Sequence, residues 1–151
     1  MIKQNSYYSI GCNEFYYLRD SVNEKYCNPA AVQAQQVAEK MLKSVAESVC
    51  TGIEKLMSSH NLRALYDAIH REEAGFILDR NALSMLKDYY FDAKYPGDNY
   101  VDVTVSELRE ALKVMLSVVE AVEQWRVNHG LDTVITDAEK EFSVAFTRLA
   151  N

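Results

Sequence analysis

Cysteine is too sparse and too irregularly placed in this chain to form a disulfide framework or a zinc site. The three cysteines, Cys12, Cys27 and Cys50, are odd in number and form no CxxC pair. That pair is the spacing that structural zinc sites and redox motifs commonly use. We therefore expect reduced thiols that pack in the core, as free cysteine usually does.

Neither a basic excess nor a long apolar run is present. The formal net charge is -6 and the pI is near 5.1, so any nucleic-acid contact needs a local basic patch. The longest apolar stretch, residues 111–122, is interrupted by Lys113, Ser117 and Glu120 and is too short to cross a membrane. The N-terminus has no apolar signal core, so we expect a cytoplasmic protein with no membrane partner.

The residue patterns of common cofactor sites are also missing. No glycine-rich phosphate loop occurs, and no histidine or glutamate of "HREE" or "EKE" is followed by a metal-ligating residue at i+4. We therefore expect no metal site and no cofactor. No Ser-His-Asp or Cys-His arrangement can be argued from the sequence. Hydrophobic residues are 48% and charged residues 25% of the chain, which is ordinary globular usage and predicts one folded domain.

Apolar residues recur at the spacing of amphipathic helices along almost the whole chain. The longest stripe follows Asn28 and Pro29, an expected N-cap with proline at the first helical position. The pattern predicts an all-α fold, an antiparallel up-down helical bundle of about five helices plus a C-terminal helix. The expected helices cover residues 13–26, 29–57, 58–73, 79–90, 105–129 and 137–149.

Capping residues mark several of the expected helix ends. Thr104 and Glu107 form a capping box, and Thr136 with Glu139 repeats it before the last helix. Gly130 stands where a C-cap glycine belongs. The stretch "YVDVTV" alternates but is short and runs into the first box, so we expect extended loop. The expected division is an N-terminal tail at 1–13, a bundle at 14–128 and a helical extension at 129–151.

Three separated motifs resemble the HEPN family. "NPAAVQAQQVAEKMLKSV" resembles the family's second-helix signature, with its glutamine-glutamine-x-x-glutamate-lysine-x-x-lysine pattern. "SSHNLRALYDAI" is similar to the next helix with its histidine-x-leucine start, and "YYFDAKYPGDNY" is similar to the later tyrosine then arginine-tyrosine-proline segment. The order and spacing agree as well, and the resemblance spans roughly Glu14 to Arg126.

The resemblance implies a bundle that commonly dimerises, with a cleft at the dimer interface that binds nucleotides or RNA. Many members partner a minimal nucleotidyltransferase as toxin-antitoxin pairs. The active members are metal-independent ribonucleases in which an arginine is followed a few residues later by a histidine. There the histidine transfers protons at the ribose 2′-hydroxyl and the leaving oxygen, and the arginine steadies the phosphate.

Arg63 and His70 satisfy that pair by pattern, but they lie in an earlier helix than the family's catalytic pair. Side chains at this spacing share one helix face whether or not they act together, so surface charge is the alternative interpretation. His60 is expected to be a helix-start residue held by a local hydrogen bond. His129, beside Gly130, is expected at a helix end, where its cation suits the dipole.

At the place that the resemblance indicates, Lys94 stands where arginine is usual and Tyr100 where a histidine is sought. Lysine keeps the charge but loses the planar fork, and tyrosine is a poor base at neutral pH. The resulting prediction is a nucleotide- or RNA-binding turn of Lys94, Tyr95, Asp98 and Tyr100, with Lys94 for phosphate and the tyrosines for stacking. The alternative is that the tyrosines complete the core or a dimer seam and that Asp92 and Asp98 are solvated turn residues; the tyrosines concerned are Tyr89, Tyr90, Tyr95 and Tyr100.

A polar face of the second expected helix carries glutamines, glutamates and lysines. Such a face usually lies in solvent, and we expect solvent exposure here, with a partner or a cleft as the alternative. The residues concerned are Gln35, Gln36, Glu39, Lys40 and Lys43.

Three functions remain open from the sequence. The leading hypothesis is a non-catalytic dimer that binds a nucleotide or RNA, or that serves as the partner half of a nucleotidyltransferase pair. The second is an active metal-independent endoribonuclease toxin, and the third is a helical dimerisation scaffold without a ligand. Ten tyrosines and five methionines exceed what one small bundle must bury, so a homodimer is expected in each case.

Overall fold

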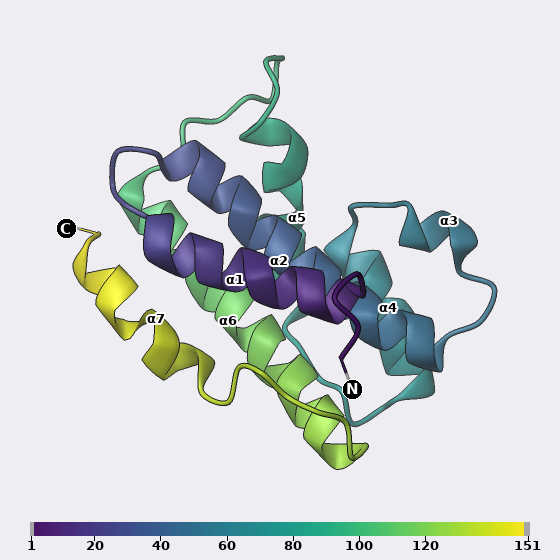
Figure 1. Cartoon of the computed structure of the whole chain (residues 1–151). Helices are drawn as coiled ribbons and strands as arrows, with labels where there is room; N and C mark the ends of the chain where they lie inside the picture. The colour runs from purple at the N-terminus through teal and green to yellow at the C-terminus, as the bar shows by residue number, and fades with distance from the viewer. Residues whose placement is uncertain (1, 150–151) are drawn as a thin grey trace.

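Seven helices and no strand make up the described part of the chain, which is residues 2–149 of a computed structural model (Figure 1). The predicted all-α bundle is therefore confirmed, and "YVDVTV" is extended loop up to the start of the sixth helix. In chain order the helices are α1 (Tyr7–Ser21), α2 (Cys27–Val49), α3 (Glu54–Met57), α4 (Leu62–Glu72), α5 (Arg80–Asp92), α6 (Val105–Asn128) and α7 (Ala138–Thr147).

The second helix, α2, is the centre of the bundle and contacts α1, α4, α5 and α6. Its apolar stripe is fully buried, as Val37, Met41 and Val45 show. Burial of a side chain of this size stabilises the fold by about 1.5–3 kcal/mol. Gly11 of α1 faces α2 so closely that a Cβ there would lie 3.3 Å from Lys40 Cβ. The absent side chain therefore allows α1 and α2 to approach each other.

The first helix begins earlier and ends earlier than its apolar pattern predicts. It starts at Tyr7, because the Ser6 hydroxyl accepts a hydrogen bond from Ser9 N at 3.1 Å and caps the helix. It ends at Ser21, since Val22 is extended, with φ -63° and ψ 132°. The expected start at residue 13 and end at residue 26 were therefore both wrong.

The helix expected over residues 29–57 is split in the structure. α2 ends at Val49, Cys50 is extended, and Gly52 adopts φ 66°, in the left-handed region that glycine tolerates best. The chain then forms the single turn α3, which stands at the side of the bundle (Figure 1). This break accounts for one helix more than the sequence predicts.

Both predicted ends of α6 are confirmed. Thr104 and Glu107 form the expected reciprocal capping box, with Glu107 N donating to the Thr104 hydroxyl at 3.1 Å. At the other end Gly130 has φ 67° and its N–H donates to Val127 O at 3.1 Å. Leu131 N donates to the carbonyl of Arg126 at 2.9 Å. These two bonds complete a Schellman motif that satisfies the last carbonyls of the helix.

The start of α7 differs from the prediction by one residue. Asp137, and not Thr136, is the N-cap, and its carboxylate accepts a hydrogen bond from Lys140 N at 3.1 Å. The expected pairing of Thr136 with Glu139 was therefore wrong. Aspartate and threonine both cap helices well, so the sequence alone does not choose between neighbouring candidates.

The segment between α6 and α7 is fastened to the bundle by two buried side chains. Val134 N donates to the Tyr8 hydroxyl at 2.7 Å, and Ile135 N donates to Glu123 Oε2 at 2.9 Å. Burial raises the pKa of Glu123 above its ordinary value, although the nearby Tyr8 hydroxyl and the Ile135 amide oppose the shift. These bonds position α7 along α6 and α1.

The cysteines are free thiols in the structure, as expected. Cys12 and Cys27 are buried, and Cys50 is half-buried. Burial raises the pKa of the Cys12 thiol to about 12, which makes it a packing group with little thiolate at neutral pH. Within residues 2–149 no helix is long and apolar enough to cross a bilayer.

Candidate functional site

A buried polar network lies in the middle of α2, where the sequence predicts solvent exposure. Gln35, Glu39 and Lys43 are only 0%, 2% and 5% exposed. Lys43 Nζ lies 2.9 Å from Glu39 Oε2, and Gln35 Nε2 donates to Glu39 Oε1 at 3.1 Å. The expectation was wrong because α2 is enclosed by four helices, so its polar face is also covered. The i, i+4 spacing of the three residues was the only available signal.

His60 extends this network into the loop before α4. Its Nδ1 lies 2.9 Å from Glu39 Oε1, and its carbonyl accepts a hydrogen bond from Gln35 Nε2 at 3.1 Å. The predicted local hydrogen bond was wrong, since the partner lies on another helix and Asn61 caps α4 instead. Burial raises the pKa of Glu39, but Lys43, His60 and Gln35 outweigh it, so the pKa is lowered overall. Glu39 is therefore a buried carboxylate anion that orients the imidazole.

An aromatic cluster of His60, Tyr90, Phe91, Lys94 and Tyr95 covers the outer side of that network. The His60 and Tyr90 rings stack with centroids 3.6 Å apart. Lys94 Nζ lies 4.9 Å from the Tyr90 centroid and 5.3 Å from the Tyr95 centroid. Phe91 and Tyr95 are 58% and 46% exposed and pack 6.1 Å apart. The cluster thus joins a cation to open aromatic faces.

A pocket of about 360 Å³ adjoins the aromatic cluster, between the loop before α4 and the last turns of α5. We call it the α5 pocket. Its volume falls in the range of small-molecule sites, about 300–1,000 Å³. Its lining includes His60, Asn61, Lys87, Asp88, Phe91 and Asp92.

The structure brings together only part of the predicted binding turn. Lys94 and Tyr95 belong to the aromatic cluster, and both start the loop that projects beyond α5 (Figure 1). Asp98 is exposed in that loop, next to Gly97. Tyr100 is 46% exposed, and its hydroxyl accepts a hydrogen bond from Asn28 Nδ2 at 3.1 Å. No ring contact joins Tyr100 to the cluster within residues 2–149, so the contact with Asn28 is its observed role.

Asn28 holds the base of the loop and is not the N-cap that the sequence predicts. Tyr26 is the N-cap and α2 begins at Cys27, two residues earlier than predicted. The Asn28 amide donates to Ala93 O at 3.1 Å and to Val101 O at 2.8 Å, and its Oδ1 accepts from Val103 N at 2.8 Å. One side chain therefore joins both ends of the loop to α2.

Arg63 and His70 are separated along α4 and have different partners. Arg63 Nη1 donates to the Ser84 hydroxyl at 3.3 Å, whereas His70 Nδ1 donates to Phe76 O at 2.9 Å. Seven positions along a helix correspond to about 10 Å of axial rise. Each side chain has a structural contact of its own, and the structure gives them no shared partner within the described residues.

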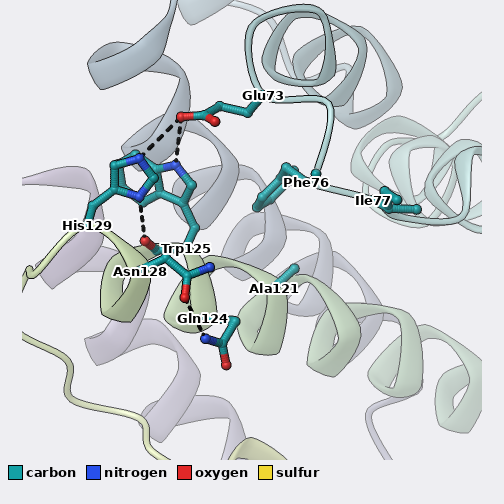
Figure 2. Close-up of a pocket in the computed structure, with 9 residues that line it drawn as sticks. Glu73, Phe76, Ile77, Ala121, Gln124, Trp125, Asn128 and His129 are labelled. Atoms are coloured by element: carbon teal, nitrogen blue, oxygen red, sulfur yellow. Dashed lines mark hydrogen bonds and ion pairs between the residues drawn. The ribbon is translucent and has the colours of Figure 1, made fainter.

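A second pocket, of about 320 Å³, lies where the carboxyl ends of α4 and α6 meet (Figure 2). One carboxylate oxygen, Glu73 Oε1, accepts from Trp125 Nε1 at 3.4 Å and lies 3.3 Å from His129 Nε2. His129 Nδ1 donates to Trp125 O at 2.8 Å, and the two rings stack. His129 therefore serves the end of α6, as its sequence position predicts, and it also ties α6 to the loop after α4.

Across residues 2–149 no group of three histidine, cysteine, aspartate or glutamate side chains is arranged to hold a metal ion. What the α5 pocket and the aromatic cluster offer is a cation, open ring faces and an imidazole fixed by a carboxylate. Those groups suit an anionic ligand that carries a flat ring.

The comparison with protein families gives one match. A family model described as HEPN domain matches residues 6–125, which is more than half of the chain. The match includes α1 through most of α6, and thus both the polar network and the aromatic cluster. A search of curated proteins and a search of solved structures each gave no match.

Proposed function

Because this chain belongs to the HEPN domain family, we propose that it binds a nucleotide or single-stranded RNA as a non-catalytic homodimer. The observation that supports this proposal is Lys94, whose ammonium lies over two tyrosine rings beside the α5 pocket. A cation can hold a phosphate there while a base stacks on the exposed rings of Phe91 and Tyr95. The two kinds of contact together suit a nucleotide better than a bare anion.

The net charge of -6 limits this binding to the local site. Non-specific attachment to a nucleic-acid backbone needs an extended basic surface, which the composition does not provide. A short ligand of one or a few nucleotides therefore fits the proposal better than a long duplex.

Lys94→Ala is expected to weaken binding of a labelled single-stranded RNA or nucleotide roughly tenfold at low salt, because a charge-assisted contact is lost. For RNA the slope of log K against log salt should also fall by about 0.7, the value for one phosphate contact on a single strand. Lys140→Ala on α7, an exposed lysine remote from α5 (Figure 1), is the matched control. Equal effects of the two variants on affinity and slope would contradict the proposal.

An active ribonuclease is the second candidate function, and the contact between Glu39 and His60 favours it. A carboxylate on Nδ1 leaves Nε2 of the same imidazole to exchange a proton, as in a general base. The test is cleavage of single-stranded RNA in EDTA by the wild type and by His60→Ala, His70→Ala and His129→Ala. The leading proposal expects no cleavage by any of them. Cleavage that only His60→Ala abolishes would replace it with the ribonuclease.

The dimer is the part of the proposal that concerns assembly. Tyr17 and Tyr26 are 65% and 63% exposed and line the same hollow between α1 and the start of α2, and neighbouring apolar side chains in water support a partner surface. Light scattering at micromolar concentration should give twice the 17.2 kDa mass of one chain. A monomer would contradict this. Membership of the family also supports a nucleotidyltransferase partner, for which co-elution from co-expressing cells would be the direct observation.

A further inference from the structure

Carboxylates line the α5 pocket, although a phosphate site would be expected to exclude them. Asp88 is accounted for, because Lys87 Nζ lies 2.9 Å from its Oδ1. Asp92 is different: the structure gives its carboxylate no hydrogen bond and no ion pair within residues 2–149, and it lines the pocket next to Phe91. Asp92 is half-buried, so its carboxylate is hydrated in the free protein, and a ligand that displaces this water is favoured if it brings hydrogen-bond donors of its own.

We propose that the α5 pocket selects guanine, with the Asp92 carboxylate accepting hydrogen bonds from N1–H and from the 2-amino group. This inference rests on the proposed function, since it assumes that the ligand is a nucleotide. Guanine has two adjacent donors on its Watson–Crick edge, which match the two oxygens of one carboxylate. Adenine and cytosine present a single exocyclic amine there, and uracil presents one N–H.

The rest of the pocket supplies the other contacts that a guanine needs. Phe91 directly precedes Asp92 in α5 and lines the same pocket, and its exposed ring offers a stacking face. The Oδ1 of Asn61 is used as the cap of α4, where it accepts from Ala64 N at 3.1 Å. Its amide N–H₂ has no acceptor within the described residues, and so it is available to the guanine O6 carbonyl.

The charges of the site also separate as a guanine nucleotide requires. Asp92 lines the pocket, whereas Lys94 does not, and the Lys94 ammonium lies over Tyr90 and Tyr95. Lys87 also lines the pocket, but its ammonium is paired with Asp88 at 2.9 Å. A phosphate is attracted by Lys94 and repelled by Asp92, so the nucleotide enters with its base inside the pocket. The carboxylate therefore helps to orient a guanine nucleotide and disfavours the reverse orientation.

The experiment titrates the full chain with GMP, IMP, AMP and UMP and follows binding by calorimetry. IMP keeps N1–H and O6 of GMP but lacks the 2-amino group, so it tests the proposed contact alone. The wild type should bind GMP about tenfold or more tighter than IMP and AMP, which is typical of a bidentate contact. Asp92→Asn should reduce GMP affinity to the level of IMP, while AMP affinity stays the same or rises because a charge that repels its phosphate is removed.

Asp88→Asn is the matched control, because Asp88 lines the same pocket but is paired with Lys87. It should keep the preference for GMP. Asp92 is the last residue of α5, where a negative charge opposes the helix dipole. Because the substitution removes this unfavourable charge, Asp92→Asn should fold as the wild type does. A melting temperature no lower than that of the wild type would confirm it.

The outcomes separate the two proposals. Equal affinity for all four nucleotides, or a GMP preference that survives Asp92→Asn, would overturn guanine selection while nucleotide binding stands. No binding of any nucleotide, together with no binding of single-stranded RNA with or without guanine, would overturn both. If only the guanine-containing RNA binds, the same base chemistry is read from RNA and not from a free nucleotide.

Discussion

Lys43→Met is expected to lower the free energy of unfolding by about 3 kcal/mol, although it replaces a charged side chain with an apolar one of similar length. Lys43 and Glu39 are almost fully buried, with side chains 6% and 3% exposed. Removing one partner of a buried pair leaves the other charge desolvated and uncompensated, which costs about 3–5 kcal/mol. The lower end applies here because Gln35 and His60 still contact Glu39.

Lys40→Met is the matched control for that experiment, three residues earlier on the same helix. Lys40 Nζ lies 3.0 Å from Glu14 Oε1, but the two side chains are 20% and 23% exposed. A partly solvated pair of this kind contributes about 1 kcal/mol or less. Urea unfolding with an unchanged m-value measures both variants. Similar losses of unfolding free energy in Lys43→Met and Lys40→Met would contradict the prediction, because they would show that the effect of breaking an ion pair does not depend on its burial.

The Lys43–Glu39 pair also predicts how the difference in unfolding free energy between the wild type and Lys43→Met depends on pH. In the wild type the pKa of Glu39 is lowered, so its contribution is complete above the unfolded pKa of about 4.3 and is lost as the pH falls through the folded pKa. In Lys43→Met the buried carboxylate loses its main cation, and protonation relieves the penalty. The gap in stability should therefore be widest near neutral pH and narrow below about pH 4.

Helix periodicity was sufficient for the fold class, because the apolar stripes of α2 and α6 face a real core. It failed at the end of α2 for a specific reason. Val49, Ile53 and Leu56 continue the stripe across the break at Gly52. A hydrophobic pattern indicates which residues are buried, but it does not indicate whether the backbone between them stays helical. Gly52 is exposed, and no atom lies within 4 Å of the position that a Cβ would take, so the left-handed conformation is a local one that glycine permits. The glycine inside the helical pattern was the one signal of this break in the sequence.

The polar network could not be predicted for a related reason. A glutamate and a lysine four residues apart are normal on a solvated helix face, and here they are buried because four helices surround α2. The contact between Glu39 and His60 joins residues 21 positions apart. Local spacing contains no information about such a pair, so the local bond expected for His60 was wrong.

The candidate site was predicted in part. The charge and aromatic character of the "FDAKYPGDNY" stretch identified Lys94 and Tyr95, which the structure places in one cluster. The alternative was that the tyrosines complete the core or a dimer seam. Tyr89, which is 7% exposed, is in the core and Tyr95, which is 46% exposed, is not, while the dimer seam stays a prediction. His60 was assigned no part in the site, because its approach to Tyr90 depends on how α4 packs against α5.

Replacing Phe91 and Tyr95 together with alanine is expected to weaken binding of single-stranded RNA on the order of 30-fold. Stacking of one base on an aromatic side chain contributes about 1–3 kcal/mol, and these two exposed rings lie close enough to act as one platform. Because neither ring contacts a phosphate, the salt dependence of binding should stay at the wild-type value. That combination differs from Lys94→Ala, which should reduce both affinity and slope.

Ile77→Ala is the control for the loss of a large exposed apolar side chain, since Ile77 is 71% exposed in the loop between α4 and α5. It should leave RNA binding unchanged. The losses of binding free energy in the two single variants, Phe91→Ala and Tyr95→Ala, should not add up to the loss in the double variant. The reason is that the two rings are in contact and are therefore energetically coupled. If the double variant binds RNA as tightly as the wild type, the aromatic cluster is a structural or dimer surface, and the scaffold hypothesis replaces ligand binding.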